Sequence, residues 1–287
     1  MKRAPRIAAI QDLSGFGRCS AAVVLPVLSA MGGQCCPMLT AYLSAHTAFP
    51  PSSHAVFFDL TEQLGETAAH WAELGVEFDA IYSGFLGSAG QIAQIESFYR
   101  RFRRPGTLVL VDPVMGDHGR PYRTYTPELC ARMRELAAQA DVITPNQTEA
   151  ALLLEEDYAS LPKDEAGLRV WLERLSLDGR RSVVLTGVSL RPGALGAGCF
   201  DRESGRMCFP MARQEPAQFP GTGDLFASVL LGALLRGEDL AGAAQLSVEF
   251  VQHCAAYTLT LGTPPLEGVQ FEPLLGELTG PRRTDVL

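Results

Sequence analysis

Lysine is the scarcest charged residue in this chain of 287 residues, and its scarcity excludes several kinds of enzyme. The only two lysines are Lys2, at the N-terminus, and Lys163, in the polar turn LPKDEAG. Neither position suits a lysine that forms a Schiff base. The chain also lacks a GxxxxGK[ST] segment and a VAIK-type segment, so neither a P-loop enzyme nor a protein kinase fits. If this protein handles phosphate, it must do so with a metal ion, backbone N–H groups or arginine.

Long apolar runs, an excess of basic charge and metal-binding cysteine patterns are also absent. No run reaches the ~18 apolar residues of a membrane span, and the apolar part of MKRAPRIAAIQ is too short for a signal peptide. The net charge of −8 gives no basic footprint for nucleic acid or for a membrane surface. The seven cysteines show no CxxC or Cys/His spacing, which predicts reduced thiols in a cytoplasmic protein. We therefore expect no nucleic-acid partner and no membrane partner.

Short apolar segments alternate with helical segments along the chain, and 47% of the residues are hydrophobic. Strands are predicted at residues 6–11, 35–40, 56–60, 78–82, 107–111, 141–143, 182–185, 198–200 and 206–210. Helices are predicted at residues 20–31, 61–74, 89–102, 127–138, 150–154, 164–175, 221–235, 240–261 and 271–275. Strands that alternate with helices predict a mostly parallel sheet covered on both faces, which is an α/β fold. We expect a single domain over residues 1–287.

The stretch PGTGDLFASVLLGALL, residues 220–235, joins a glycine-rich turn to a long apolar helix. The N–H groups of Gly221, Thr222 and Gly223 would open this helix, and a helix start attracts phosphate through its free donors and its dipole. Asp224 follows directly and has two interpretations. In the first it takes a proton from a hydroxyl group while the N–H groups stabilise a phosphoryl group in transfer. In the second it only caps the helix.

Five of the predicted strands end in polar residues. Ligands of parallel α/β sheets bind beyond the carboxyl ends of the strands. The residues at these ends are Asp12 and Ser14, Ser83 and Gly84, Asp112 and Asp117, Thr144 to Glu149, and Thr186. A solvated surface would not collect polar residues at all five ends. The pattern therefore favours the catalytic interpretation of Asp224 over the helix cap.

Asp112 and Asp117 in VDPVMGD, and Glu149 in PNQTE, place carboxylates at two of these ends. Mg²⁺ prefers oxygen ligands and takes one or two protein carboxylates together with waters and substrate phosphates. Phosphoryl transfer needs alignment and charge neutralisation, which a cation held by Asp112 and Glu149, mostly through water, would supply. In the alternative, Asp112 caps a turn and Glu149 is an ordinary first-turn residue. That alternative explains Glu149 alone but does not explain the set.

Two residues outside these motifs are candidates for binding a small substrate. The five histidines show no ligand spacing, but His46 lies in a predicted loop between Ser44 and Thr47, where it could bind a polar molecule. Tyr82 could stack on a planar ring, although an isolated aromatic residue is more often part of the core.

The segments SGFLGS, DPVMGD, ITPNQTEA and GTGDLFA together resemble the ribokinase-like superfamily, and within it the pyridoxal/pyridoxamine kinases. The resemblance extends from Ile7 to about Leu261. It implies a three-layer αβα sandwich without a separate lid domain. It also implies ATP-dependent phosphorylation of the 5′-hydroxymethyl group of pyridoxal, pyridoxine or pyridoxamine, with Mg²⁺, and a homodimer.

The resemblance also implies a role for each matching residue. Asp224 is the general base, with an anion hole made by Gly221, Thr222 and Gly223. The predicted ATP-binding residues are Asp112, Thr144, Asn146, Glu149, Thr186, Thr222 and Gly223. The predicted metal ligands are Asp112 and Glu149 for Mg²⁺, partly through water, and Asp117 and Thr144 for a monovalent cation, K⁺ or Na⁺. The predicted substrate-binding residues are Asp12, Ser14, His46, Thr47, Tyr82 and Asp224.

The chain departs from the family pattern at the end of the first strand. Members commonly have Gln-Ser there, whereas this chain has Gln11 and Asp12. Either Ser14 replaces the missing serine, or Asp12 binds a substrate amine or ring N–H, which would suit pyridoxamine. A hydroxymethylpyrimidine kinase of thiamine synthesis is therefore the alternative function. A catalytically silent nucleotide- or vitamin-binding protein is the third hypothesis, but a binding protein would have no need of the base Asp224.

Overall fold

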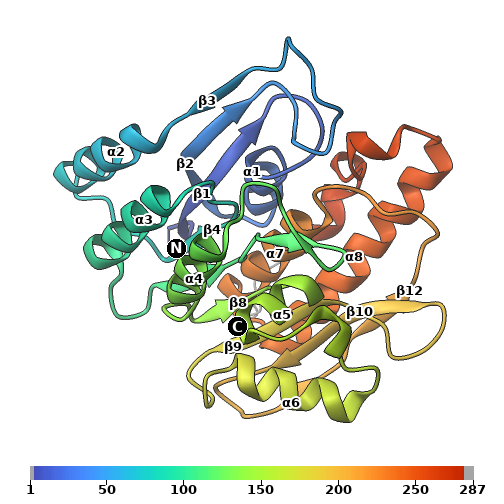
Figure 1. Ribbon diagram of the computed structural model, residues 1–287. Coiled ribbons are helices and arrows are strands. Elements are labelled where there is room, and N and C mark those ends of the chain that lie inside the picture. The colour runs from blue at the N-terminus through green and yellow to red at the C-terminus, as the bar shows by residue number, and fades with distance from the viewer. Residues whose placement is uncertain (1–2, 281–287) are drawn as a thin grey trace.

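A sheet of ten strands runs through the middle of the protein, whose computed structural model describes residues 3–280 (Figure 1). Its strands are β1 Arg6–Ser14, β2 Gln34–Leu43, β3 Phe57–Asp59, β4 Ala80–Ser83, β5 Leu108–Val111, β8 Val142–Ile143, β9 Ser182–Val188, β10 Ala194–Phe200, β11 Met207–Cys208 and β12 Met211–Arg213. They lie in the order β11-β10-β9-β8-β5-β4-β1-β2-β3, and β12 pairs with β10. The pairings from β2 through β1, β4, β5 and β8 to β9 are parallel, and the strands added at both ends are antiparallel.

Helices cover both faces of this sheet, as predicted. They are α1 Ala21–Ala30, α2 Thr61–Glu73, α3 Ala89–Phe102, α4 Pro127–Ala137, α5 Gln147–Leu154, α6 Glu165–Leu175, α7 Thr222–Leu235 and α8 Leu240–Leu261. Helices α2 to α6 pack side by side on one face, whereas α1, α7 and α8 pack together on the other (Figure 1). None of the helices between residues 3 and 280 combines the length and the apolar character that crossing a bilayer requires.

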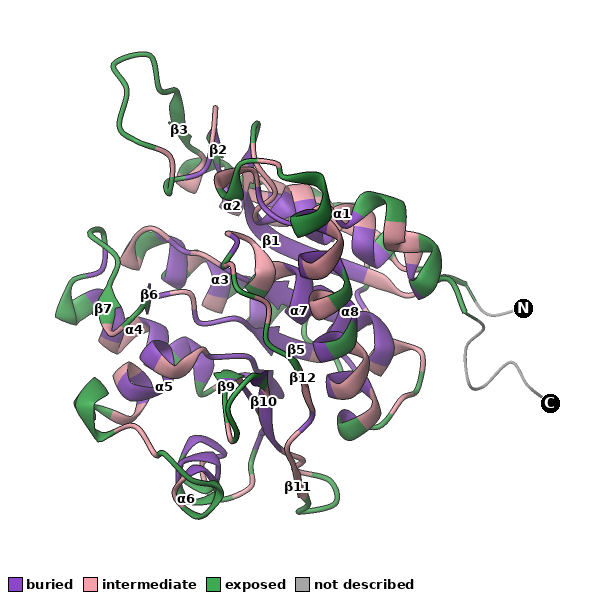
Figure 2. Cartoon of the chain, turned by 90° about the vertical axis from the view of Figure 1, so that its right-hand side faces the viewer, coloured by how far each residue is buried: buried purple, intermediate pink, exposed green. Residues whose placement is uncertain are grey.

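Alternating side chains of the central strands divide the core into two halves. In β1, Ala8 and Ile10 face helices α2 to α6, whereas Ile7 and Ala9 face α1, α7 and α8. This alternation follows from the period of two in a strand. Because both sides of the strand are apolar, these strands appear in the sequence as continuous hydrophobic runs. The buried (purple) sheet between two layers of helices is visible in Figure 2.

The structure corrects the predicted bounds of several elements. β1 continues past Gln11 to Ser14, and β2 continues to Leu43, because the two strands keep pairing beyond an irregularity between Gln11 and Leu13. The predicted loop after residue 40 therefore begins only at Ser44. β10 starts at residue 194, and the short helix predicted at 271–275 is a 3₁₀-helix over residues 272–278. The connection from β2 to α2 contains only β3, so the described residues include no separate lid domain, as predicted.

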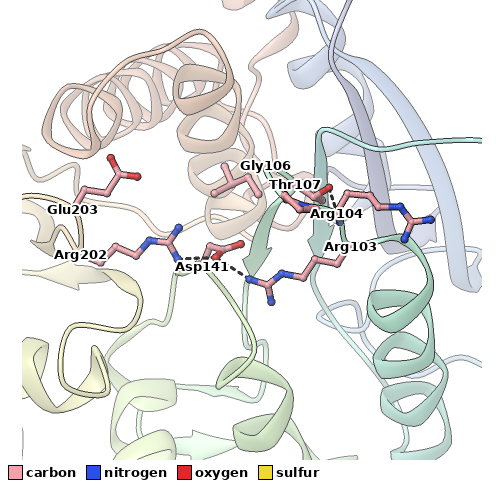
Figure 3. Close-up of a pocket in the computed structure, with 9 residues that line it drawn as sticks. Arg103, Arg104, Gly106, Thr107, Asp141, Arg202 and Glu203 are labelled. Carbon is pink, nitrogen blue, oxygen red and sulfur yellow. Dashed lines mark hydrogen bonds and ion pairs between the residues drawn. The ribbon is translucent and has the colours of Figure 1, made fainter.

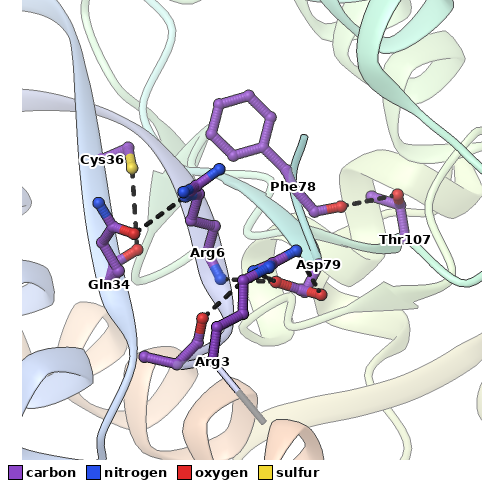
Figure 4. Close-up of polar contacts among 8 residues, drawn as sticks. Arg3, Arg6, Gln34, Cys36, Phe78, Asp79 and Thr107 are labelled. Carbon is purple, nitrogen blue, oxygen red and sulfur yellow. Dashed lines mark hydrogen bonds and ion pairs between the residues drawn. The ribbon is translucent and has the colours of Figure 1, made fainter. Parts of the chain in front are cut away.

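The amino ends of the parallel strands are held together by side chains (Figure 4). Asp79 accepts hydrogen bonds from the Arg3 guanidinium, at 2.6 Å, and from the backbone N–H of Arg6, at 2.7 Å. The Thr107 hydroxyl donates to the carbonyl oxygen of Phe78 at 2.9 Å. These contacts join the starts of β1, β4 and β5. The predicted functional residues lie at the carboxyl ends, on the opposite edge of the sheet.

Candidate active site

The centre of the site is the turn that opens α7. Gly221 has a φ of 77°, a left-handed conformation that favours glycine. A Cβ atom at Gly221 would lie 1.9 Å from the carbonyl oxygen of Arg18, so no larger residue fits there without moving the backbone. The first turn closes where the N–H of Leu225 donates to the carbonyl oxygen of Gly221, at 3.0 Å. The N–H groups that precede Leu225 in this turn have no acceptor within the helix and are free to meet an anion.

Asp112, at the end of β5, lies next to this turn. A Cβ atom at Gly223 would lie 4.0 Å from Oδ2 of Asp112, and Gly223 itself is exposed. The hydroxyl of Thr222 donates to the carbonyl oxygen of Phe219 at 3.2 Å, so it is already engaged within the turn. The predicted anion hole and the predicted magnesium ligand Asp112 are therefore neighbours in the structure.

Two carboxylates with raised pKa values meet at this point. Burial raises the pKa of Asp224 to about 7, the N–H of Ser20 lowers it, and the charge of Asp12 raises it further. Burial also raises the pKa of Asp112 to about 8, and the neighbouring charge of Asp224 adds to this. A group that accepts a proton works best when its pKa lies near the working pH. The environment of Asp224 is therefore suited to a general base, and a simple helix cap would not need it.

Asp12 and Ser14, the last residues of β1, lie next to Asp224 but are turned toward each other. The Ser20 hydroxyl donates to Oδ1 of Asp12 at 2.6 Å, and the Ser14 hydroxyl donates to Oδ2 at 3.4 Å. Burial raises the pKa of Asp12, and these hydroxyl groups lower it. Only 7% of the Asp12 surface is exposed. Its carboxylate is thus engaged within the protein, while its predicted role toward a substrate remains a prediction.

Glu149 and Asn146 form a reciprocal cap at the start of α5. The Asn146 side chain accepts from the N–H of Glu149 at 2.9 Å, and the Glu149 carboxylate accepts from the N–H of Asn146 at 2.7 Å. The N–H of Met115 donates to the other Glu149 oxygen at 3.2 Å. Burial, and then the charge of Asp112, raise the pKa of Glu149 well above its ordinary value. The capping role is therefore real, and it fixes a carboxylate near Asp112.

Three other predicted nucleotide and cation residues surround this cap. The Thr144 hydroxyl is buried and lies close enough to Asp112 to lower the pKa of that carboxyl. Asp117 lies on the short strand β6 (Gly116–Asp117), which pairs with β7 (Arg120–Pro121), and 53% of its side chain is exposed. The Thr186 N–H donates to the carbonyl oxygen of Pro145 at 2.9 Å, which joins the ends of β8 and β9.

The predicted substrate residues His46 and Thr47 lie on the loop after β2. His46 is buried: its Nδ1 accepts from the N–H of Ala48 at 3.3 Å, and its Nε2 donates to the carbonyl oxygen of Leu266 at 2.7 Å. Both ring nitrogens are therefore bound to backbone groups, and the His46 ring holds two loops together. Thr47 is exposed in the adjacent turn.

Tyr82 is not exposed in the site. Its side chain has no exposed surface and belongs to the core that contains α7. Burial raises its pKa first, and the charges of Asp112 and Asp224 then raise it further, so its hydroxyl lies on the acidic side of that core. A ring without exposed surface cannot stack on a ligand. The stacking role predicted from the sequence is corrected to a packing role beneath the site.

Sequence reasoning missed two residues of the site. The N–H of Ser20 donates to Oδ2 of Asp224 at 2.8 Å, although no motif singled out this serine. Tyr122 is 41% exposed, and after partial burial the negative charges of Glu149, Asp117, Asp112 and Asp224 help to raise the pKa of its hydroxyl. The only sequence signal for Tyr122 is its place in the loop that follows DPVMGD. Ser20 had no signal, because its contact joins positions 204 residues apart.

A cavity of about 590 Å³ lies elsewhere, at the amino ends of the strands (Figure 3). Arg103 and Arg202 both contact Oδ1 of Asp141, at 2.9 Å and 2.6 Å. Their charges are thus directed to a carboxylate of the protein, and none of the predicted site residues lines this cavity. The predicted site residues Asp112 and Asp224 lie instead at the start of α7.

The fold is that of known kinases. The chain matches the family described as phosphomethylpyrimidine kinase over residues 25–267. Pyridoxal kinase PdxY of Deinococcus radiodurans is 30% identical over 96% of this chain and 93% of that protein. A provisionally assigned phosphomethylpyrimidine kinase from Bacteroides thetaiotaomicron, crystallised with pyridoxal, is 39% identical and has a TM-score of 0.91 over 98% of both chains. Pyridoxal kinase from Lactobacillus plantarum is 33% identical, with a TM-score of 0.87 over 96% of both chains.

The ribokinase-like sandwich and an acidic site at the start of a glycine-opened helix define a small-molecule kinase. The chain belongs to the phosphomethylpyrimidine kinase family, and its homologues include pyridoxal kinases. The family resemblance predicted from the sequence motifs is confirmed. The roles of the individual site residues stay predictions.

Proposed function

We propose that this protein transfers the γ-phosphate of ATP to the 5′-hydroxymethyl group of pyridoxal, pyridoxamine or pyridoxine. The observation that carries the proposal is the position of the Asp224 carboxylate, in the first turn of α7 beside the free N–H groups and Asp112. The names of the homologous pyridoxal kinases supply the chemical class of the acceptor, and the crystal of the Bacteroides relative contained pyridoxal.

The proposed reaction is a direct transfer. Asp224 takes the proton of the hydroxymethyl group, and the oxygen forms a bond to the γ-phosphorus while the bond from that phosphorus to the bridging oxygen of ADP breaks. The N–H groups of Gly221, Thr222 and Gly223 meet the negative charge that spreads over the phosphoryl oxygens. The dipole of α7 acts in the same direction. Asn146 and Thr186, at the ends of the neighbouring strands, complete the proposed ATP site.

Mg²⁺ is the ion that we propose for this site. Among residues 3–280, no three His, Cys, Asp or Glu side chains gather into a metal site made by the protein alone. This arrangement fits an ion held by one or two carboxylates and otherwise by phosphates and waters. Asp112 is the proposed ligand, and Glu149 acts through water because its oxygens already accept two N–H groups. The ion would neutralise phosphate charge.

A monovalent cation, K⁺ or Na⁺, is proposed beside Asp117 and Thr144. The Thr144 hydroxyl is buried beside Asp112, and 53% of the Asp117 side chain is exposed, so both offer oxygen ligands. We also propose a cytoplasmic location, because the seven cysteines, all within the described residues, are free thiols as in a reducing compartment.

A homodimer is the proposed assembly. The sheet ends at β3, whose outer edge carries no further strand among the described residues. Phe57 and Phe58 on β3 are each 61% exposed, and the segment around them projects from the sandwich as an exposed region (Figure 2). An apolar, unpaired edge strand is a surface on which a second chain can pair.

Hydroxymethylpyrimidine is the alternative acceptor, because the family description names a kinase that acts on a related pyrimidine. The test is ADP release with Mg·ATP and, in parallel, pyridoxal, pyridoxine, pyridoxamine and hydroxymethylpyrimidine. A preference of more than about tenfold in kcat/KM, worth ~1.4 kcal/mol of transition-state binding, identifies the substrate. A higher kcat/KM for the pyrimidine would overturn the assignment of a B6 vitamer as the acceptor, but the assignment of phosphoryl transfer would stand.

The base role is tested by Asp224→Asn. This variant should fold normally and lose about 10²–10⁴-fold in kcat, the usual contribution of a general base. Asp178→Asn is the matched control, since Asp178 is exposed, lies outside the site and has a left-handed φ of 59° that asparagine tolerates. An Asp224→Asn variant with near-normal kcat would rule out the base role.

A further inference from the structure

Ser20 has an unusual backbone for the residue that starts a helix. It precedes α1 with φ 50° and ψ −130°, whereas a residue in this position normally has an extended backbone. A serine there usually accepts a hydrogen bond from an N–H of the first turn, but Ser20 makes no such cap. Non-glycine residues keep such a backbone only when their surroundings hold them there. An explanation must come from the contacts of Ser20 outside the helix.

Those contacts join two carboxylates from different elements. The Ser20 hydroxyl donates to Oδ1 of Asp12, at 2.6 Å, and the Ser20 N–H donates to Oδ2 of Asp224, at 2.8 Å. Asp12 belongs to β1 and Asp224 to α7. Only 8% of the Ser20 surface and 7% of the Asp12 surface are exposed to solvent. Water therefore does not compete freely for these hydrogen bonds. The unusual φ of Ser20 is what turns its N–H toward Asp224 while its hydroxyl is held by Asp12.

The segment before Ser20 is fixed as well. The Arg18 guanidinium donates to Glu272 at 2.7 Å and to Gln270 at 2.7 Å, which ties the segment to the C-terminal part of the described chain. The Arg18 carbonyl oxygen lies directly behind Gly221. The same short segment therefore supports the glycine turn on one side and the Asp224 carboxylate on the other.

We propose that Ser20 is a positioning residue for Asp224 and that Asp12 holds Ser20 in place. The Ser20 N–H fixes Oδ2 of Asp224, which leaves Oδ1 to take the proton of the acceptor hydroxyl. This inference rests on the proposed function, because it assumes that Asp224 is the base. It assigns to Asp12 a role toward Ser20, where the sequence suggested a bond to a substrate amine.

The first experiment compares Ser20→Ala, Ser20→Gly, Asp12→Ala and Asp12→Asn by steady-state kinetics. Ser20→Ala, Ser20→Gly and Asp12→Ala remove the bond between the Ser20 hydroxyl and Asp12, so the Ser20 N–H is no longer held toward Asp224. Each should lower kcat by about 10–100-fold, the cost of a reacting group misplaced by ~1 Å. The KM for ATP should stay within about twofold. Ser20→Gly keeps a stable fold because glycine adopts this backbone readily. Asp12→Asn keeps an oxygen acceptor for the Ser20 hydroxyl and should lose clearly less kcat than Asp12→Ala.

The alternative role of Asp12 gives the opposite result. If its charge binds the amine of pyridoxamine, Asp12→Asn and Asp12→Ala would raise the KM for pyridoxamine equally and leave the kcat for pyridoxal unchanged. That outcome would overturn the proposal. Ser29→Ala is the matched control, because Ser29 is an exposed serine of α1 that is remote from the site.

The second experiment adds Ser20→Ala to Asp224→Asn. If Ser20 acts only through Asp224, the serine substitution should change the residual rate of Asp224→Asn by less than about twofold, because coupled residues are not additive. A loss as large as in the wild-type background would overturn the proposal. If Asp224→Asn is inactive but Ser20→Ala and Ser20→Gly retain normal kcat, only the positioning role fails. If Asp224→Asn itself retains kcat, the base role fails, and the positioning role fails with it.

Discussion

At the scale of single residues, the site depends on a carboxylate that keeps its proton unusually well. Burial is the main cause of the raised pKa of Asp224, and the charge of Asp12 is a smaller one. The single N–H of Ser20 lowers this pKa only in part. A base in this range can both accept the proton of an alcohol and release it after turnover at neutral pH.

This pKa predicts how the rate depends on pH. Asp224 with a pKa of about 7 is protonated in more acidic solution and cannot act as a base there. We expect kcat/KM, measured with saturating Mg·ATP, to fall as the pH is lowered through about 7. The apparent pKa of this acidic limb of the pH profile belongs to the Asp224 and Asp112 pair, because the two carboxylates influence each other.

Asp224→Asn serves as the control for this profile. Its residual rate should lack the acidic limb, since the titrating base is gone. A wild-type kcat/KM that stays level down to pH 5 would contradict a base with the environment described here.

At the scale of elements, the start of α7 shows two glycines that are needed for different reasons. Gly221 is required by its left-handed backbone and by the Arg18 carbonyl behind it. Gly223 is already helical and exposed, and the nearest atom to its missing Cβ is the Asp112 carboxylate, at 4.0 Å. The first glycine therefore shapes the turn, whereas the second keeps the space in front of it open.

Alanine substitutions should separate these two roles. Gly221→Ala should destabilise the protein by ~1 kcal/mol or more, because alanine does not fit a positive φ. Each kcal/mol lowers Tm by about 2–4 °C in a protein of this size range. Gly223→Ala should leave Tm nearly unchanged and lower kcat/KM, because its methyl group occupies the phosphate side of the turn. Thermal melts and kinetics of both variants check this, and equal losses of Tm would contradict it.

At the scale of the whole molecule, one sheet carries two cores. Helices α2 to α6 enclose one core and α1, α7 and α8 enclose the other, and each central strand contributes alternate residues to both. Both cores share the same central strands. If the helices on either face lost their packing, the apolar side chains on that face of the strands would be exposed. This arrangement supports the prediction that residues 1–287 form a single domain.

Unfolding should therefore occur in one step. Trp71 and Trp171 both pack in the core under α2 to α6, so their fluorescence reports that half, whereas the far-UV circular dichroism signal reports helices on both faces. We expect the two thermal transitions to have the same midpoint, as two-state unfolding requires. Midpoints separated by several degrees would show that the halves unfold independently.

The proposed homodimer can be tested at its edge strand. Phe57→Ser combined with Phe58→Ser removes the exposed aromatic surface of β3 and should convert a dimer to a monomer with a normal far-UV circular dichroism spectrum. Size-exclusion chromatography with light scattering measures the mass of both proteins. A wild-type protein that is already monomeric at about 10 µM, in the usual range of stable association, would contradict the proposal.

The sequence by itself determined the layer architecture, the family and the positions of most polar strand ends. These features are local: apolar runs of strand length, helices between them, and the motifs DPVMGD, TPNQTE and GTGD are each contained in a few neighbouring residues. Because parallel strands end at one edge of a sheet, local motifs were enough to predict that Asp112, Asn146, Glu149 and Asp224 gather at that edge. Glu149 caps the first turn of α5 and also places a carboxylate near Asp112, so the capping interpretation does not exclude the other one.

Only the tertiary structure decided which side chains are free to act. Tyr82 has an aromatic ring that could stack on a ligand, but the alternation of side chains in β4 points it into the core. His46 is in the predicted loop, but both of its ring nitrogens are bound to distant and local backbone groups. Ser20 carries no motif and yet contacts Asp12 and Asp224. Contacts of this kind depend on backbone angles and on residues far apart in the chain, so no local pattern of the sequence contains them.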